Sequence, residues 1–203
     1  MHPHPTSPPA GISAEALAQL FTHARTCAQF DPTPIPRTTL EQLYALASLG
    51  PTSMNCQPAR FVFVVSEVAR KRLLPHVAPG NRDKVSAAPV TVIVARDTRF
   101  YEWMPTLWHM PGTQENFERD PALARATAQR NATLTGGYLI LAARALGLAC
   151  GPMSGFDAQG VNDSFFSDGR WEVDFLLNVG FAAGAPARPR AVRLDFSQAC
   201  AVA

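Results

Sequence analysis

Lysine is nearly absent from this chain of 203 residues, which has 2 lysines, 16 arginines and 16 acidic residues. The formal charge of +2 argues against a nucleic-acid-binding protein, because such proteins concentrate positive charge. Charged residues are also scarce, at 17%, whereas 47% of the residues are apolar. This composition is typical of one globular domain and argues against a disordered or fibrous chain.

Cysteine clusters and long apolar runs are missing too. The cysteines at positions 27, 56, 150 and 200 form no CxxC pair, so we expect reduced thiols, a cytoplasmic protein and no metal site. The most apolar segment, residues 134–148, is shorter than the ~20 residues of a membrane span. The N-terminus has no apolar signal-peptide core. We therefore predict a disordered lead over residues 1–12 and a single domain over 13–203.

Familiar catalytic motifs are absent as well. The sequence has no GxGxxG, no GxxxxGK[ST] and no GxSxG, and its five histidines lack metal-ligand spacing. What remains is a set of polar loops that contain Arg, Ser, Asn, Thr and Gly. Such groups bind phosphates and the edges of heterocycles. The sequence therefore favours a protein that binds a phosphorylated organic cofactor, which then performs the chemistry.

Apolar patterning predicts an α+β fold with a central sheet covered by helices. Helices are expected over residues 13–29, from about 38 to 49, near 66–78 and over 121–148. Buried strands are expected over 61–65, 89–95 and 174–182, because these runs are apolar without alternation. The segments PGNRDKVSAA and GPMSGFD are expected to be loops, and the C-terminus to end in a short strand-like segment.

The segment GPTSMNCQPARF (residues 50–61) resembles the signature loop of the nitroreductase family. Three later segments follow in that family's order: GNRDK with APVTVIVA, then ALGLACGPMSGFD, then the terminal basic segment. The resemblance covers about residues 13–200. It implies a three-layer α+β fold with a central mixed sheet, an intertwined homodimer with FMN at the subunit interface, and NADH or NADPH as co-substrate.

Shorter matches, among them PheTyrGlu at 100–102 and RALGL at 144–148, resemble one branch, the malonic semialdehyde reductases of the Rut pathway of pyrimidine degradation. That branch implies reduction of malonic semialdehyde to 3-hydroxypropionate by hydride from NAD(P)H through FMN. Two other functions stay open. One is a general nitro or quinone reductase of the same fold, and the other is a non-catalytic flavin-binding module.

The resemblance also assigns site residues. Those matching the phosphate contacts are Arg25, Thr26, Arg190 and Arg193. Those matching residues that reach the flavin from the partner subunit are Ser53 and Asn55. Those matching contacts to the pyrimidine edge of the flavin are Asn81 and Lys84, and those matching the loop that faces flavin N5 are Met153, Ser154 and Gly155.

Two arginines are candidates to bind the carboxylate of the substrate, namely Arg60 and Arg130. Two positions depart from many nitroreductases. Ala28 stands where many have a Lys or Arg, and Ser154 stands where many have a Glu, a replacement that the malonic semialdehyde branch shares. Taken singly, Arg25 is as typical of a solvated helix as of a site, whereas Ser53 and Asn55 are more typical of a turn and Lys84 of the surface. Their combination in the family's order is what favours a flavin site.

Overall fold

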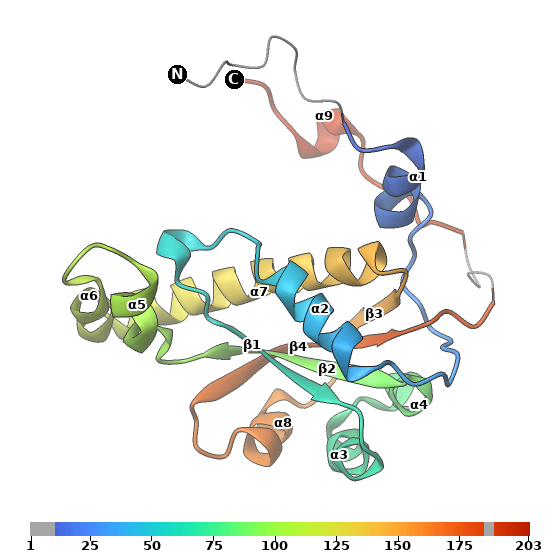
Figure 1. Cartoon of the computed structure of the whole chain (residues 1–203), viewed down its shortest axis with the longest axis horizontal. Helices are drawn as coiled ribbons and strands as arrows, with labels where there is room; N and C mark the ends of the chain where they lie inside the picture. The colour runs from blue at the N-terminus through green and yellow to red at the C-terminus, as the bar shows by residue number, and fades with distance from the viewer. Residues whose placement is uncertain (1–10, 185–188) are drawn as a thin grey trace.

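The computed structural model describes residues 11–184 and 189–203. Its sheet has the strand order β1-β2-β4-β3, and every neighbouring pair is antiparallel (Figure 1). The strands are β1 Ala59–Val64, β2 Val90–Asp97, β3 Ala149–Met153 and β4 Trp171–Gly180. The sheet is thus antiparallel rather than mixed. Apolar runs reveal strands but not which strands pair, so the sequence could not establish their relative directions.

Helices cover both faces of this sheet (Figure 1). On one face lie α2 Arg37–Ala47 and α7 Pro121–Ala145, and on the other lie α3 Glu67–Leu73, α4 Pro79–Ala87 and α8 Ala158–Phe165. Val92 joins the core under α2 and α7, whereas the next residue, Ile93, joins the core under α3, α4 and α8. Successive strand residues point to opposite faces. The three-layer α+β architecture is therefore confirmed.

The irregular segment after β2 forms three short helices, η4 Phe100–Trp103, α5 Met104–Leu107 and α6 Thr113–Arg119. Phe100 and Phe117 are buried there against Ala124 and Ala128 of α7. Beyond the other end of α7 lie α1 Ala14–Leu17, the π-helix η1 Ala18–Thr22, and a C-terminal segment containing α9 Phe196–Ala199 (Figure 1). These terminal elements stand away from the sheet, and we call residues 189–203 the C-terminal arm.

The first helix is shorter than predicted, because it ends at Thr22 instead of continuing to residue 29. The following residues are extended: the N–H of Cys27 donates to the carbonyl of Cys150 at 2.7 Å, and Phe30 forms a bridge with Ala182. Pairing with distant strands thus overrides the local helical pattern. Most of the expected disordered lead over 1–12 lies outside the described residues.

Three other local predictions were wrong. The predicted loop PGNRDKVSAA is mainly helix α4, which begins with Pro79, a residue that tolerates the first helical position because the N–H it lacks would be unpaired there. The segment GPMSGFD begins inside β3, because residues 149–153 pair with β4. The C-terminal segment contains the short helix α9 instead of a strand, and the capping box of Asp195 and Gln198 stabilises the start of this helix. Across the described ranges, no helix is long and apolar enough to cross a bilayer.

Candidate functional site

Two arginines that are far apart in sequence meet beside the first helix. Arg25 follows η1, and its Nη1 donates to the carbonyl oxygens of Thr22 and Ala24, both at 2.9 Å. Arg190 comes from the C-terminal arm, and its Nη2 donates to the same two oxygens at 3.1 and 2.9 Å. Because the two guanidinium groups share acceptors, their positive charges lie close together.

Two further arginines add to this charge. Partial removal from water, and then repulsion from Arg25, Arg193 and Arg144, lower the pKa of Arg190. No described Asp or Glu forms a salt bridge with any of the four. We call Arg25, Arg144, Arg190 and Arg193 the arginine cluster. Like charges without a counter-charge attract an anion, and guanidinium groups suit phosphate in particular.

Strand β3 connects the arginine cluster to a second set of polar groups. The bridge between Thr26 and Cys150 places the hydroxyl-bearing Thr26 beside the beginning of β3. From Cys150 the strand runs to Met153, whose side chain packs against the core under α3 and α8. The four steps from Cys150 to Ser154 span about 13 Å in an extended chain. Phosphate donors and loop donors therefore lie at opposite ends of one short strand.

At the far end of β3, α4 and the following loop meet closely. Asn81 Nδ2 donates to the carbonyl of Gly155 at 3.3 Å, and Lys84 Nζ donates to Asn81 Oδ1 at 3.2 Å. A Cβ at Gly155 would lie 2.6 Å from Asn81 Nδ2, so any other residue here would displace the Asn81 amide. No described residue accepts a hydrogen bond from the backbone N–H of Ser154 or Gly155. We call Asn81, Lys84, Ser154 and Gly155 the amide corner.

The residues expected to act across a subunit boundary lie elsewhere. Ser53 and Asn55 lie in the 3₁₀ turn η2 Ser53–Asn55, and the N–H of Ser53 donates to Oδ1 of Asn131 on α7 at 2.8 Å. Arg144 of the arginine cluster lies thirteen residues further along α7, which is about 20 Å at the rise of an α-helix. One chain therefore does not bring Ser53 and Asn55 to the arginine cluster.

The backbone around η2 is unusual. Met54, Asn55 and Gln57 have φ angles of 50, 52 and 39°, in a left-handed region that residues other than glycine seldom adopt. The side chain of Gln57 donates to Asn55 Oδ1 at 2.9 Å, and Asn55 Nδ2 donates to the carbonyl of Leu107 at 3.2 Å. Such conformations persist where neighbours hold them, and they concentrate at functional sites.

The two candidate substrate arginines differ. Arg60 donates through Nη2 to Oδ2 of the buried Asp97 at 2.7 Å, and through Nη1 to the carbonyls of Gln57 and Ala59. Its guanidinium group is thus largely committed to the protein. Arg130 is exposed on α7 and has no hydrogen-bond or ion-pair partner among the described residues. Arg130 is therefore the freer of the two to bind a ligand.

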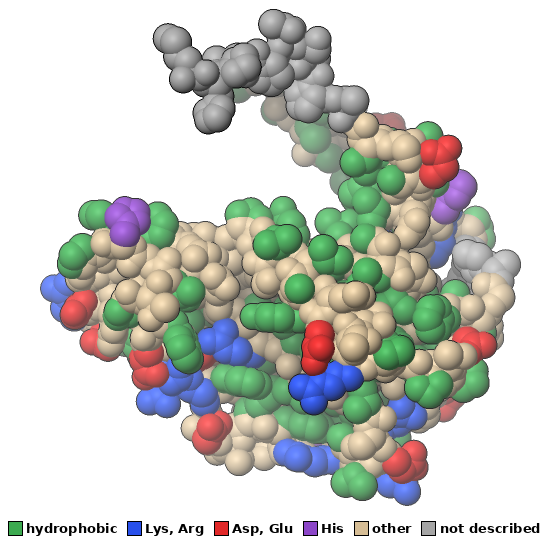
Figure 2. Space-filling model, in the orientation of Figure 1, with side chains coloured by type: hydrophobic (Ala, Val, Ile, Leu, Met, Phe, Trp, Pro, Cys, Tyr) green, Lys and Arg blue, Asp and Glu red, His purple; other side chains and the backbone are tan. Residues whose placement is uncertain are grey.

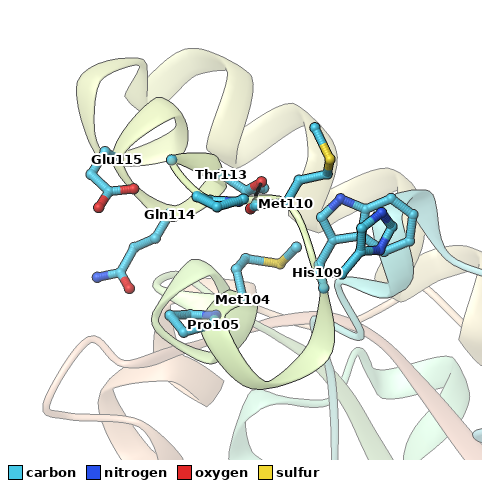
Figure 3. A pocket seen from close by; sticks show the side chains of 10 residues that line it. Met104, Pro105, His109, Met110, Thr113, Gln114 and Glu115 are labelled. Atoms are coloured by element: carbon cyan, nitrogen blue, oxygen red, sulfur yellow. Dashed lines mark hydrogen bonds between the residues drawn. The ribbon is translucent and has the colours of Figure 1, made fainter.

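Two hollows lie away from the amide corner. One of about 880 Å³ runs along α2 and the edge strand β1, and its lining includes Arg60, Trp103 and Trp171. The other, of about 340 Å³, lies among Met104, His109, Gln114 and their neighbours of the α5–α6 segment (Figure 3). Arg60 is the one candidate site residue among those that line these two hollows.

The described residues contain no group of three or more His, Cys, Asp or Glu that could hold a metal ion. The buried thiols are also poor nucleophiles. Burial raises the pKa of Cys56 to about 11 and that of Cys150 to about 12, so both stay protonated at neutral pH. The polar groups described above are therefore suited to binding a ligand rather than to attacking one.

Comparison with known proteins decides the family. The model of the nitroreductase family matches residues 22–181. The chain belongs to the nitroreductase family. Relatives that share the name "Putative NADH dehydrogenase/NAD(P)H nitroreductase" align over most of its length. The protein from Ralstonia nicotianae is 46% identical over 94% of this chain and 98% of its own, and that from Leptothrix cholodnii is 50% identical over 92% and 95%.

The folds of solved nitroreductases agree with this membership. A structure described as a "putative nitroreductase in complex with FMN" from Exiguobacterium sibiricum superposes with a TM-score of 0.77. It is 23% identical and covers 98% of this chain and 100% of its own. At that identity the likeness shows the fold alone.

Two residues that the structure of this nitroreductase brings to the candidate site were not predicted from its sequence. Arg144 ends α7 and joins the arginine cluster, and the buried Asn131 holds the N–H of Ser53. A usable signal existed for Arg144, because it is a cation in the last turn of a long helix that precedes the GPMSGFD segment. For Asn131 the signal was an amide side chain on the face of α7 whose other buried residues are small or apolar.

Proposed function

We propose that this nitroreductase binds FMN and uses it to transfer hydride from NADH or NADPH to an organic acceptor. The observation that carries the proposal is the placement of two donor groups at opposite ends of β3, the arginine cluster and the amide corner. A phosphate joined to a heterocycle by a flexible chain satisfies both. The FMN in the Exiguobacterium structure and the names of the bacterial relatives support the same choice.

The chemical types of these hydrogen-bond donors also match the parts of FMN. Guanidinium groups suit a phosphate dianion. Asn81 and Lys84 offer N–H donors for the carbonyl oxygens of the pyrimidine edge, and the backbone N–H groups of Ser154 and Gly155 are free to donate to a ring nitrogen. FMN, when bound, supplies the hydride chemistry, while the chain holds and orients it and excludes water. With Ser154 instead of a carboxylate, the amide corner favours an anionic acceptor.

The working unit in this proposal is a homodimer with the flavin at the interface. Ser53 and Asn55 lie about 20 Å along α7 from the arginine cluster, so the partner subunit would have to supply them. Apolar residues are exposed where a partner could cover them: Leu17 and Phe21 beside the first helix, Leu134 on α7, and Leu194 and Phe196 on the C-terminal arm. Figure 2 shows hydrophobic side chains at the surface of the first helix and over α2.

The acceptor that we propose is malonic semialdehyde. Its aldehyde carbon gains hydride and its oxygen gains a proton to give 3-hydroxypropionate, while NAD(P)H is oxidised to NAD(P)⁺. The stretches that resemble the malonic semialdehyde reductases support this choice. A carboxylate substrate needs a cation, and of the two candidates Arg130 has the uncommitted guanidinium group. The compartment that we propose is the cytoplasm, in keeping with four free cysteines.

A second candidate function is a general nitro or quinone reductase, which the names of the relatives favour. Oxidation of NADH or NADPH by the flavin-loaded protein separates the two. Faster oxidation with malonic semialdehyde supports the first function, and faster oxidation with nitroaromatics or quinones supports the second. If no acceptor stimulates oxidation, the chain is a non-catalytic flavin-binding module. The variant Arg130→Ala should raise KM for the semialdehyde only, and should leave flavin content unchanged.

The first test is the visible absorption spectrum of the purified protein, followed by acid release of any chromophore. We expect about one FMN per chain. Replacing Arg25 with Gln should remove most of this FMN. The variant Arg119→Gln is the control, because Arg119 is an exposed arginine of α6 that bonds only within its own helix. A colourless protein that also fails to bind added FMN would overturn the proposed function.

A further inference from the structure

The last turn of α7 contributes a cation that the resemblance did not assign. Arg144 is half-buried, and its Nη1 donates to the carbonyl of Leu20 in η1 at 2.8 Å. Its own backbone carbonyl accepts a hydrogen bond from Gln19 Nε2 at 2.6 Å. These bonds hold the end of α7 against η1. They use only one nitrogen of the guanidinium group, which leaves its other donors free.

Three guanidinium groups from three elements therefore bind to one short segment. Arg144 binds the carbonyl of Leu20, and Arg25 and Arg190 both bind those of Thr22 and Ala24. Backbone carbonyls solvate these cations but carry no net charge, and no described carboxylate pairs with them. The cluster thus keeps its full positive charge for a ligand.

The extended segment beyond Arg25 does not add to this charge. Ala28 is exposed and presents only a methyl group. The side of the cluster next to β3 therefore depends on α7 for a cation. Arg144 lies close enough to Cys150, the second residue of β3, to act electrostatically on its thiol as well as on Arg190. Its positive charge therefore acts on both the beginning of β3 and the C-terminal arm.

We propose that Arg144 is a phosphate-binding cation of the flavin site, supplied by α7 in place of the cation that Ala28 lacks. This inference rests on the proposed binding of FMN. It differs from a purely structural role, in which Arg144 only ties η1 to α7. If the role is structural, loss of Arg144 should weaken the binding of every flavin equally. If Arg144 binds phosphate, its loss should weaken only the binding of a ligand that carries phosphate.

FMN and riboflavin separate the two roles, because they differ only in the phosphate. Dissociation constants for both are measured by flavin fluorescence on the flavin-free full-length protein. We expect Arg144→Gln to weaken FMN binding about tenfold, which is about 1.4 kcal/mol, and to leave riboflavin binding within about twofold. Arg144→Lys keeps the charge and should restore most of the preference for FMN. Added salt should weaken FMN binding less in Arg144→Gln than in the wild type.

The matched control is Arg70→Gln. Like Arg144, Arg70 is half-buried and donates only to backbone carbonyls, here those of Ser86 and Pro89, but it lies outside the cluster. It should leave both flavin affinities unchanged. Equal weakening of FMN and riboflavin in Arg144→Gln, or no weakening of either, would overturn the inference while the wild type still binds FMN. A wild type that binds neither flavin would overturn the proposed function itself.

Discussion

Asp97 is the buried charge that joins three strands. Its carboxylate is 1% exposed and pairs with Arg60 at 2.7 Å and with Arg170 at 2.7 Å, where each arginine side chain is about one-fifth exposed. Arg60 lies at the beginning of β1, Arg170 lies just before β4, and Asp97 ends β2. Because these strands are antiparallel, the three residues meet at one end of the sheet. This explains why Arg60 has little freedom to bind a substrate.

Replacing Asp97 with Asn should destabilise the fold. The variant keeps the shape of the side chain but leaves two arginines facing a neutral group, and breaking such a buried pair costs on the order of 3 kcal/mol. The free energy of unfolding in urea measures this loss. As a control, Arg37→Gln breaks an exposed pair with Glu41 and should cost under about 1 kcal/mol. Similar small losses in both variants would contradict the prediction.

The buried thiol of Cys56 should make the free energy of unfolding depend on pH in the alkaline range. Burial raises its pKa from 9.0 to about 11, so between these values the thiol ionises in the unfolded chain but not in the folded one. The free energy of unfolding should therefore fall as pH rises from 9 to 11. The decline should be shallower in Cys56→Ala and unchanged in Cys200→Ala, whose cysteine is exposed. Equal slopes in all three proteins would show that Cys56 does not titrate this way.

Residue types alone could predict which chemistry the site supports but not how the residues pair. The resemblance implied roles for Arg25, Arg190, Asn81 and Gly155. In the fold, the two arginines meet near the beginning of β3, and Asn81 and Gly155 meet near its end. Arg60 and Arg130 were equal candidates to bind the substrate carboxylate, because the ion-pair partner of Arg60, Asp97, lies 37 residues away in sequence. Long-range pairs of this kind depend on strand register, which no local pattern contains.

At the scale of elements, α7 approaches the sheet through a glycine. A Cβ at Gly136 would lie 2.6 Å from Phe175 Cε1 and 3.3 Å from Val94 Cγ1. The variant Gly136→Ala should therefore lower the free energy of unfolding by about 1–3 kcal/mol through overpacking. In α4, Gly80→Ala places its methyl group in open space and should instead raise the free energy of unfolding by up to about 1 kcal/mol. Urea unfolding of the flavin-free proteins compares the two, and the same sign in both would contradict this packing.

The long periodic and apolar segments were the elements that the sequence predicted well. Helices α2 and α7 and strands β1, β2 and β4 occur close to their expected positions, because burial against the sheet agrees with their local pattern. Two of the failures, the first helix and β3, were segments whose conformation depends on a distant partner. Cys27 pairs with Cys150, and β3 pairs with β4, so tertiary hydrogen bonds decide both.

At the scale of the whole molecule, the residues of the proposed site lie at two separate places along α7. The arginine cluster lies at the C-terminal end of that helix. Ser53 and Asn55 lie near its middle, where the N–H of Ser53 donates to Asn131. If two chains share each site, a chain with a defective arginine cluster and a chain with a defective η2 can together form one intact site. The two halves can therefore be inactivated separately.

The test mixes two defective proteins, Arg190→Ala and Asn55→Ala, after joint unfolding and refolding. Each homodimer has two damaged sites. A heterodimer combines both lesions in one site and leaves the other site intact, so equal mixing should restore about a quarter of the wild-type sites. Bound FMN and NAD(P)H oxidation in the mixture measure this recovery, and mixing the folded proteins without unfolding is the control. No recovery after refolding would mean that one chain builds the whole site, which would require η2 to approach the arginine cluster of its own chain.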